Sequence, residues 1–288
     1  MTALLLAGAL LAATAADYRA EIERWRAERE AGLKADDGWL TLVGLHWLKP
    51  GANSFGSARE NAIVLPAGAP AVAGRLEHRA GKTTVSLAKG VDARIAGAPA
   101  DGRELGLGGG GRGPDVLELG SLSMFVIRRG DRYALRARDK QSPTRRAFTG
   151  LQWFAVDPAY RVLARFVPHA ALTRIPIPNV IGIVTPMKTP GKVVFELRGK
   201  RLTLEPVFES DDAKELFYIF KDETARKETY GAGRFLYSGL PKDGKLILDF
   251  NKAYSPPCAY TDYATCPLPP KQNVLDVRIE AGERFSGH

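Results

Sequence analysis

The sequence contains little of what common catalytic and metal-binding motifs require. Its 288 residues include two cysteines and four histidines, and His46, His78, His169 and His288 show no metal-ligand spacing. The motifs G-x-S-x-G, H-E-x-x-H and C-x-x-C are absent from the sequence. We therefore expect no cofactor and no metal site, and these motifs leave open whether the chain is an enzyme.

Long hydrophobic runs are also missing after the N-terminus, so we expect no integral membrane segment in the mature chain. The first sixteen residues, MTALLLAGALLAATAA, carry no charge. They end near Ala13-Thr14-Ala15, which fits the small-x-small pattern of signal peptidase sites. We expect residues 1–16 to be a signal peptide and the protein to be exported, periplasmic or secreted. The alternative is the uncleaved N-terminus of a cytosolic protein.

Acidic residues are outnumbered, which gives a net charge of +9. Basic residues are concentrated between Arg128 and Arg146. In a cytosolic protein this stretch would suggest nucleic acid, whereas outside the cytoplasm anionic glycans, lipid head groups or solubility explain it better. A solvated strand face is the simplest explanation. We expect no nucleic acid partner and consider a small-molecule or anionic glycan ligand.

Hydrophobic periodicity predicts one helix followed by many short strands. Residues 17–38 form an amphipathic segment, with Tyr18, Ile22, Trp25 and Leu33 at helical spacing. From Trp39 the period changes to two, and Gly, Pro and Asp turns separate the alternating runs. We expect an N-terminal β-sandwich over residues 39–149.

A second β-rich series begins after Gly150 and extends over residues 150–288. Two alternating runs on either side of Gly199 predict a hairpin, and the proline-containing stretch from Pro168 to Pro190 is interpreted as a crossing loop. The final run NVLDVRIEAGE is interpreted as another strand. The expected fold is mainly β, with the sandwich packed on a second antiparallel β-domain that is barrel-like or a sandwich.

Two clusters of polar residues are candidate sites. The first, FKDETARKETYGAGRF (Phe220–Phe235), holds Asp222, Thr224, Tyr230 and Arg234 between two apolar strands. Arg234 could hold a carboxylate or phosphate in a bidentate fork, or it could pair internally with Asp222.

The second cluster is LDFNKAYSPPCAYTDYATCPLPP (Leu248–Pro270). Asp249 and Asn251 lie two apart and therefore share a strand face, and Tyr254 follows them. In an oxidising compartment Cys258 and Cys266 are expected to form a disulfide, and in the cytosol they would suggest thiol or metal chemistry.

Nearly the whole mature chain resembles a bacterial family, the domain of unknown function 1684. The resemblance is carried by FKDET, ETYGAGRFL, LDFNKAYSPPCAY and CPLPPKQNVLDVRIEAGE, and also by GWLTLVGLHWL and RARDKQSPTRRAFTGLQWF nearer the N-terminus. It implies no activity, because the family is defined by sequence alone.

A second resemblance covers Pro50–Tyr133, whose order of motifs is similar to a forkhead-associated β-sandwich. Such modules recognise phosphothreonine through an arginine, a serine and an asparagine. The corresponding positions here hold Ser57, Arg75 and Ala96, so the resemblance implies the sandwich without its phosphopeptide site.

Three functions remain open at this stage. The leading hypothesis is binding of a small or glycan-like ligand at the open end of the C-terminal β-domain, with Arg136 and Arg138 adding positive charge. The second is hydrolysis of a cell-envelope or imported polymer, with Asp222 and Asp249 as acid and base and Arg234 stabilising negative charge. The third is a structural or interaction protein that binds no ligand.

Overall fold

The computed structural model describes residues 2–109 and 112–285, and its architecture is mainly β, as predicted. Contacts within the chain divide it into two compact units. Unit 1 comprises Met1–Ala31, Thr149–Ala259 and Thr265–His288, and unit 2 comprises Gly32–Phe148 and Tyr260–Ala264.

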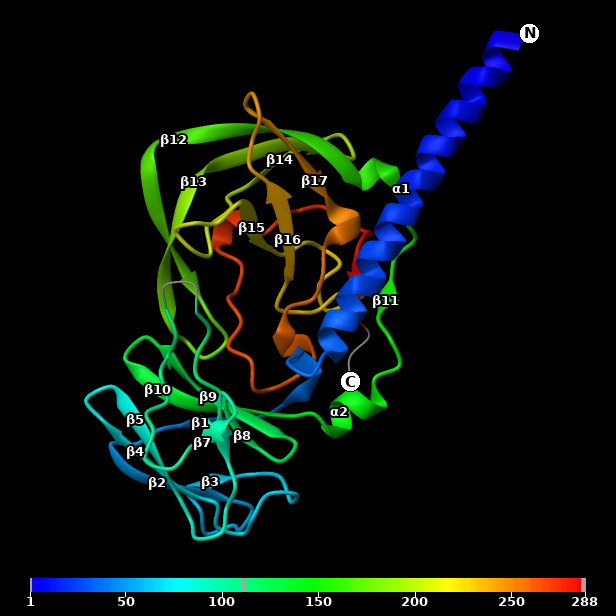
Figure 1. The fold of residues 1–288 in the computed structure, drawn as a ribbon. Coiled ribbons are helices and arrows are strands. Elements are labelled where there is room, and N and C mark those ends of the chain that lie inside the picture. The colour runs from blue at the N-terminus through cyan, green and yellow to red at the C-terminus, as the bar shows by residue number, and fades with distance from the viewer. Residues whose placement is uncertain (1, 110–111, 286–288) are drawn as a thin grey trace. The chain divides into compact units, whose positions relative to one another are not determined.

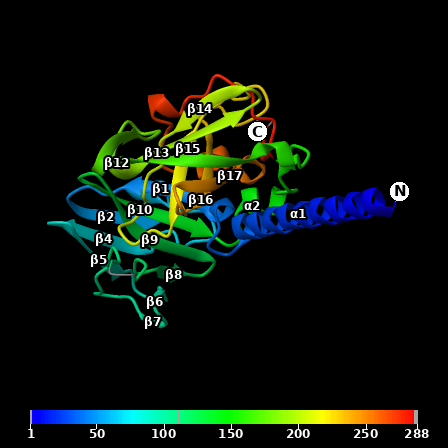
Figure 2. The same cartoon turned by 90° about the horizontal axis from the view of Figure 1, so that it is seen from above.

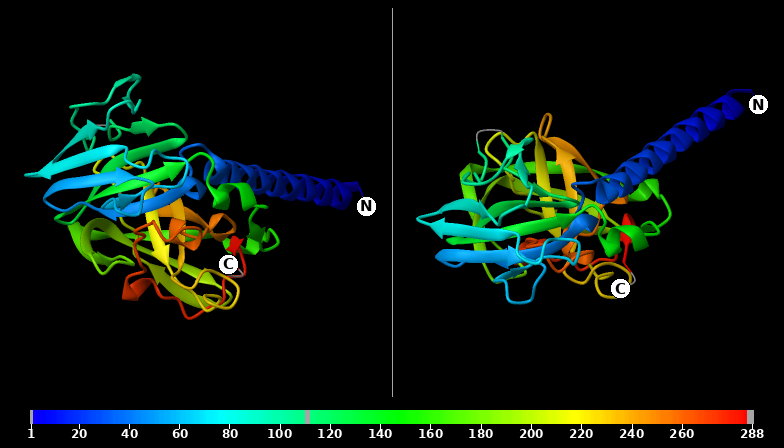
Figure 3. Two further views of the ribbon diagram at one scale, coloured as in Figure 1. Left: turned by 90° about the horizontal axis from the view of Figure 1, so that it is seen from below. Right: turned by 60° about the horizontal axis from the view of Figure 1, so that its bottom comes forward.

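The predicted amphipathic helix is the C-terminal part of a longer one, α1 (Thr2–Lys34), which Figure 3 shows as one uninterrupted coil. Ile22 on its inner face is fully buried, and the guanidinium of Arg26 donates to the Phe154 carbonyl at 2.9 Å. The predicted signal peptide lies in the same helix, and its side chains up to residue 15 are outside the described part. No helix of the described residues is both long and apolar enough to cross a bilayer.

Unit 2 is a two-sheet sandwich. One sheet has the strand order β1-β10-β9-β8-β6-β7, and the other has the order β3-β2-β4-β5. Its elements are η1 (Trp39–Thr41), β1 (Leu42–Trp47), β2 (Gly51–Gly56), β3 (Ile63–Val64), β4 (Gly74–Arg79), β5 (Lys82–Leu87), β6 (Arg94–Ile95), β7 (Ala98–Pro99), β8 (Leu117–Leu119), β9 (Leu122–Arg129), β10 (Arg132–Asp139) and α2 (Pro143–Ala147). Phe55 and Leu76 of the smaller sheet share one core with Met124 and Leu135 of the larger. This arrangement follows from the period-two alternation of the strands.

Unit 1 contains a four-stranded sheet of order β14-β13-β12-β17 and two two-stranded sheets, β15-β16 and β11-β18. Its elements after α1 are β11 (Gln152–Trp153), η2 (Pro158–Tyr160), β12 (Arg161–Pro178), β13 (Val184–Leu197), β14 (Lys200–Leu204), β15 (Glu215–Phe220), β16 (Arg234–Gly239), β17 (Lys245–Asp249), η3 (Phe250–Lys252), η4 (Pro257–Ala259), η5 (Lys271–Asn273) and β18 (Glu283–Arg284). Every sheet of the described residues is open, so the barrel-like alternative is wrong.

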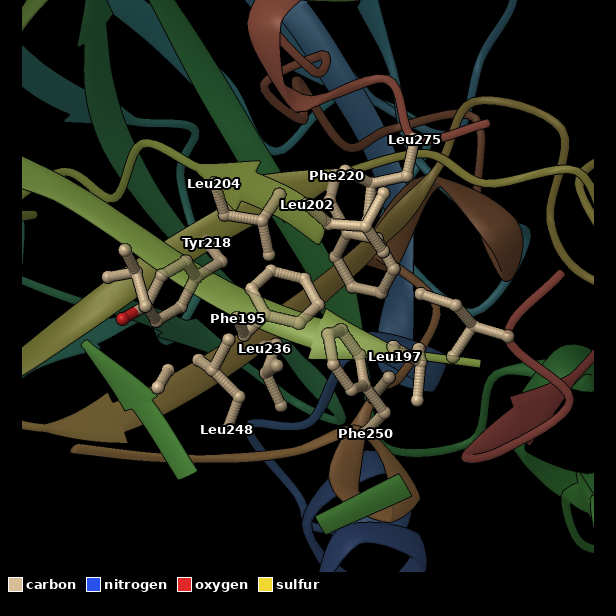
Figure 4. Packing of buried hydrophobic residues seen from close by; sticks show 14 of the residues in the cluster. Phe195, Leu197, Leu202, Leu204, Tyr218, Phe220, Leu236, Leu248, Phe250 and Leu275 are labelled. Atoms are coloured by element: carbon tan, nitrogen blue, oxygen red, sulfur yellow. The ribbon is translucent and has the colours of Figure 1, made fainter. Parts of the chain in front are cut away.

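The core of unit 1 lies between the four-stranded sheet and the β15-β16 pair. Figure 4 shows Phe195 of β13 and Leu248 of β17 facing Tyr218, Phe220 and Leu236 of that pair. The Phe250 ring lies 5.6 Å from Phe195 and 5.6 Å from Phe220, which joins the layers at the end of β17. Burial of these rings supplies much of the hydrophobic stabilisation of the unit.

The crossing loop predicted between Pro168 and Pro190 is wrong, because most of this stretch belongs to strands β12 and β13. The two strands run side by side and bend together in Figures 1 and 2, and their register shifts between Pro168 and Thr173. Beyond this shift neither β12 nor β13 pairs with a second strand of the described residues, so a proline there removes no ladder hydrogen bond to another strand. The high proline content of this stretch therefore indicates strands with unpaired outer edges and not a loop.

The hairpin predicted around Gly199 is confirmed. Leu197 pairs with Lys200, and the two turn residues Arg198 and Gly199 have φ of 51° and 74°. A two-residue turn with both φ values positive matches the twist of the flanking strands.

The strand predicted for NVLDVRIEAGE is wrong except at its last residue, Glu283, which begins β18. The preceding segment keeps the alternation of a strand, since Leu275, Val277 and Ile279 are buried. Its backbone bonds largely to loop and side-chain groups, including the Glu223 amide, which donates to the Val277 carbonyl at 3.1 Å.

A test of this packing is Gly282→Ala compared with Gly199→Ala. Both glycines have left-handed φ, 79° and 74°, but a Cβ at Gly282 would lie 2.3 Å from the Ala253 carbonyl oxygen, whereas one at Gly199 meets nothing within 4 Å. We expect Gly199→Ala to lower the free energy of unfolding by about 1 kcal/mol and Gly282→Ala by about 3 kcal/mol or more in urea denaturation. Equal losses would contradict the close approach of the C-terminal segment.

Candidate functional site

The first predicted cluster is a buried structural assembly, the Arg234 cluster, formed by Arg234, Asp222, Thr224 and Thr229. The guanidinium of Arg234 bonds Asp222 Oδ1 at 3.0 Å, and both side chains are 1% exposed. The Thr224 hydroxyl donates to Asp222 Oδ2 at 2.8 Å and lies 2.9 Å from the Thr229 hydroxyl. The internal Asp–Arg pair considered from the sequence is therefore present.

This cluster holds the C-terminal segment in place. Arg234 donates to the carbonyls of Ile279, at 2.9 Å, and Ala281. Asp222 Oδ2 accepts from the Ile279 amide at 2.8 Å. In a sheet, an adjacent strand would bond the amide and the carbonyl of one residue and the carbonyl of the residue two positions later. Ile279 and Ala281 present these groups here. The side chains of Arg234 and Asp222 thus replace a neighbouring strand.

Part of the second predicted cluster joins helix α1 to the end of β17. The Tyr18 hydroxyl donates to Asp249 Oδ1 at 2.8 Å, and Asn251 Nδ2 donates to the Tyr18 oxygen at 2.9 Å. Asn251 also exchanges two hydrogen bonds with the backbone of Asp157, at 2.8 and 3.0 Å. Burial and the bond to Asp249 raise the pKa of Tyr18, so the phenol remains a donor.

Asp249 also lines a cavity of about 380 Å³ in unit 1. The lining residues come from α1, the starts of β12 and β15, the ends of β16 and β17, and the segment from η3 onward, and Figure 1 labels the helix and these strands. The lining residues of the cavity are Glu21, Trp25, Arg161, Glu215, Tyr237, Ser238, Gly239, Ile247, Asp249, Lys252 and Tyr254. We take this cavity as the candidate site, because it gathers aromatic and charged side chains from six segments of the chain.

Three aromatic side chains line the cavity. The rings of Tyr237 and Tyr254 stack at 6.4 Å with an interplanar angle of 13°, and the Trp25 ring lies 6.3 Å from Tyr254. Burial raises the pKa of Tyr254 to about 12, and burial together with Tyr254 and Glu209 raises the pKa of Tyr237. Both phenols are therefore neutral at ordinary pH and can donate or accept hydrogen bonds.

The charged groups of the cavity are largely paired with one another. Lys252 Nζ bonds Glu21 Oε1 at 2.6 Å, which lowers the pKa of Glu21, and Arg161 Nε lies 4.0 Å from Asp249 Oδ2. Glu215 is the third carboxylate of the lining, against two cations. The cavity is therefore close to electrically balanced while it is rich in donors and acceptors.

The structure separates the residues that the sequence grouped into one site. Asp249 and Tyr254 line the cavity, whereas Asp222, Thr224 and Arg234 are buried in the Arg234 cluster. Tyr230 donates to the Cys258 carbonyl at 3.0 Å. The proposed acid–base pair Asp222 and Asp249 thus does not share the cavity.

Arg136 and Arg138 belong to β10 of unit 2 and lie over aromatic rings within it. The Arg136 guanidinium is 5.5 Å from the Trp39 ring centre, and that of Arg138 is 4.9 Å from the Phe125 ring centre. Burial lowers the pKa of Arg138. Both side chains alternate along β10 with the sandwich-core residues Leu135 and Ala137, so they lie on the outer face of the larger sheet, where their stems pack on these rings.

Cys258 and Cys266 are free thiols in the structure, so the predicted disulfide is not formed there. The Cys258 amide donates to Cys266 Sγ at 3.1 Å, and a hydrogen bond with Cys266 lowers the pKa of the Cys258 thiol. Groups of three or more histidine, cysteine or carboxylate ligands do not occur within residues 2–109 and 112–285.

Sequence reasoning missed Trp25, Arg161 and Tyr237. Trp25 carried only a packing signal, because it lies on the apolar stripe of the helix. Arg161 is the cross-strand partner of Asp249, which requires the β12-β17 register. Strand alternation could have identified Tyr237, since it faces away from the buried Leu236.

Comparisons with known proteins add a family but no activity. The profile of the family described as "Protein of unknown function (DUF1684)" matches residues 146–284. An uncharacterized protein of Haloarcula marismortui, solved by solution NMR, is 34% identical over 49% of this chain and 80% of that chain, with a TM-score of 0.42. No curated protein matches the chain. The forkhead-associated resemblance is not confirmed.

The structural role of the Arg234 cluster can be tested by denaturation. Arg234→Met should lower the free energy of unfolding by about 3–5 kcal/mol, because it leaves Asp222 buried without its counter-charge. The double variant Asp222→Leu/Arg234→Met should recover only part of this loss, since Ile279 and Ala281 still lack partners. As a control, Arg79→Met removes the surface ion pair to Glu77, in which Arg79 is 79% exposed, and should cost less than about 1 kcal/mol. A double variant as stable as the parent would contradict the proposed backbone role.

Proposed function

Because the chain belongs to the family described as "Protein of unknown function (DUF1684)", which carries no activity, we propose a function from its cavity: binding of a neutral, sugar-like ligand. The observation that carries the proposal is the combination of Trp25, Tyr237 and Tyr254 with paired charged groups in one lining.

The aromatic lining suits the faces of a sugar ring. A pyranose presents C–H groups on its faces and hydroxyl groups around its edge. Aromatic rings contact the C–H faces, while the Tyr237 hydroxyl is held by its hydrogen bond to Glu209. Trp25 and Tyr237 come from α1 and β16, so two separate elements can contact one ring. A volume of about 380 Å³ is in the usual range for small-ligand sites.

The charge pattern favours a neutral ligand over the anionic glycan considered from the sequence. Lys252 already bonds Glu21, and Arg161 faces Asp249. An anion would have to compete with these carboxylates for the two cations. Hydroxyl groups can instead donate to the carboxylates and accept from the cations without breaking either pair.

Hydrolysis of the ligand is not favoured by this geometry. Asp222 has its oxygens occupied by Arg234, Thr224 and the Ile279 amide. Asp249 accepts bonds from Tyr18 and Asn251 and stabilises the end of β17. Both carboxylates are thus engaged within the fold, and we expect binding without turnover.

The proposal can be tested by calorimetric titration with neutral mono- and disaccharides, including glucose, galactose, N-acetylglucosamine and maltose. We expect at least one of them to bind, and Tyr237→Ala to weaken its affinity about threefold to tenfold, through loss of the ring contact. Tyr237→Phe keeps the ring and should bind within about twofold of the parent.

The matched control is Tyr263→Ala, since Tyr263 is an exposed tyrosine that does not line the cavity. Its affinity should equal that of the parent. If no sugar binds and Tyr237→Ala only lowers stability, the aromatic lining is structural and the proposal is wrong.

We also propose that the chain is exported, because residues 1–16 are uncharged and contain the small-x-small pattern Ala13-Thr14-Ala15. Intact-mass measurement of protein isolated from its own cells should then show a chain that lacks this leader. A full-length chain in the cytoplasmic fraction would contradict export without affecting the cavity.

A further inference from the structure

The sugar-like site is the middle of a longer groove, formed by three hollows that share walls. The cavity shares Gly239 and Ile247 with a second hollow of about 410 Å³. It shares Glu215 and Tyr237 with a third hollow of about 190 Å³. The three hollows together follow β16 and its neighbours, and we call them the groove.

The second hollow is the apolar end of the groove. It is lined by Leu163, Leu240, Leu246 and Ile247, together with Gly239, Lys242 and Lys245. Leu163, Leu240 and Ile247 are 62%, 43% and 38% exposed, so apolar surface remains in contact with water. Leu163 and Ile247 are cross-strand partners on β12 and β17, and their side chains therefore lie side by side on one face.

The cavity and this apolar end adjoin at Gly239, which lines both. A Cβ built at Gly239 meets no atom within 4 Å, and Ile247 borders both hollows. A ligand bound in the cavity can thus continue onto the apolar surface. The aliphatic stems of Lys242 and Lys245 can cover such an extension while their ammonium groups stay in water.

The opposite end of the groove is polar. It is lined by Glu209, Ser210, Lys214 and Glu215, together with Ala213 and Tyr237. Polarity therefore changes along the groove, from hydroxyl and charged groups, through the aromatic cavity, to a strip of leucine and isoleucine. A uniformly polar oligosaccharide would leave this strip exposed to water.

We propose that the natural ligand is an amphiphile, a neutral sugar-like head group that carries one aliphatic chain. The head group occupies the cavity against Trp25 and Tyr237, and the chain lies over Leu163, Leu240 and Ile247. The inference rests on the proposed sugar binding and adds the chemical class of the ligand. Continuity of the two hollows at Gly239 carries it, and burial of the exposed strip supplies the added affinity.

The test is calorimetric titration with methyl, butyl, hexyl and octyl β-D-glucosides, each kept below its micelle-forming concentration. Affinity should increase about twofold to fourfold for each added CH₂ group that reaches the strip. Octyl glucoside should therefore bind at least about a hundredfold more tightly than methyl glucoside.

Leu163→Ser and Leu240→Ser should each reduce this dependence on chain length and leave the affinity for methyl glucoside unchanged. Leu172→Ser is the matched control, because Leu172 is a 56% exposed leucine on the same strand, β12, outside the second hollow. It should bind every glucoside as the parent does.

Each outcome separates the two proposals. Equal affinity for methyl and octyl glucoside, or sugar binding without any glucoside binding, would overturn the amphiphile and leave the sugar site intact. Octanol binding as tightly as octyl glucoside would overturn the head-group assignment. If neither free sugars nor any glucoside binds, the sugar site is wrong, and the amphiphile is wrong with it.

Discussion

The ion pair between Arg234 and Asp222 is the interaction on which unit 1 depends. Both side chains are buried, so each charge requires the other. Together they bond the backbone of Ile279 and Ala281 and keep an irregular segment against the β15-β16 pair. Arg234 begins the strand that carries Tyr237. The same pair therefore closes the core and fixes the strand that contributes an aromatic ring to the cavity.

A second polar junction fixes the other wall of the cavity. Tyr18 of α1 bonds Asp249 and Asn251 at the end of β17, and Asn251 bonds the Asp157 backbone. This junction positions Asp249 and, two turns further along the helix, Trp25. Because buried polar groups must be satisfied, each junction accepts few alternative geometries. The cavity between them is thus preformed, which lowers the conformational cost of binding a ligand.

The sequence predicted the fold class and much of the pairing, because alternation and turn residues act locally. The hairpin at Gly199 needed only its own turn. The stretch from Pro168 to Pro190 was misread, since proline tolerance depends on whether a neighbouring strand exists. Of the residues that line the cavity, only Asp249 and Tyr254 were predicted from the sequence as site residues. Asp222 and Arg234 were predicted as site residues because they belong to a polar cluster. Such clusters also form where a backbone segment lacks a strand partner. Only long-range contacts distinguish a ligand site from a cluster of this structural kind.

The most direct test of the central claim, a sugar-like ligand in the cavity of unit 1, is an NMR titration of the ¹⁵N-labelled protein with the sugar that binds. The account predicts shift changes at the Trp25 indole N–H and at the amides of Tyr237, Ser238 and Gly239, with the amides of Asp222 and Ile279 unchanged. Changes confined to residues outside the cavity lining, or no changes at saturating sugar, would contradict it.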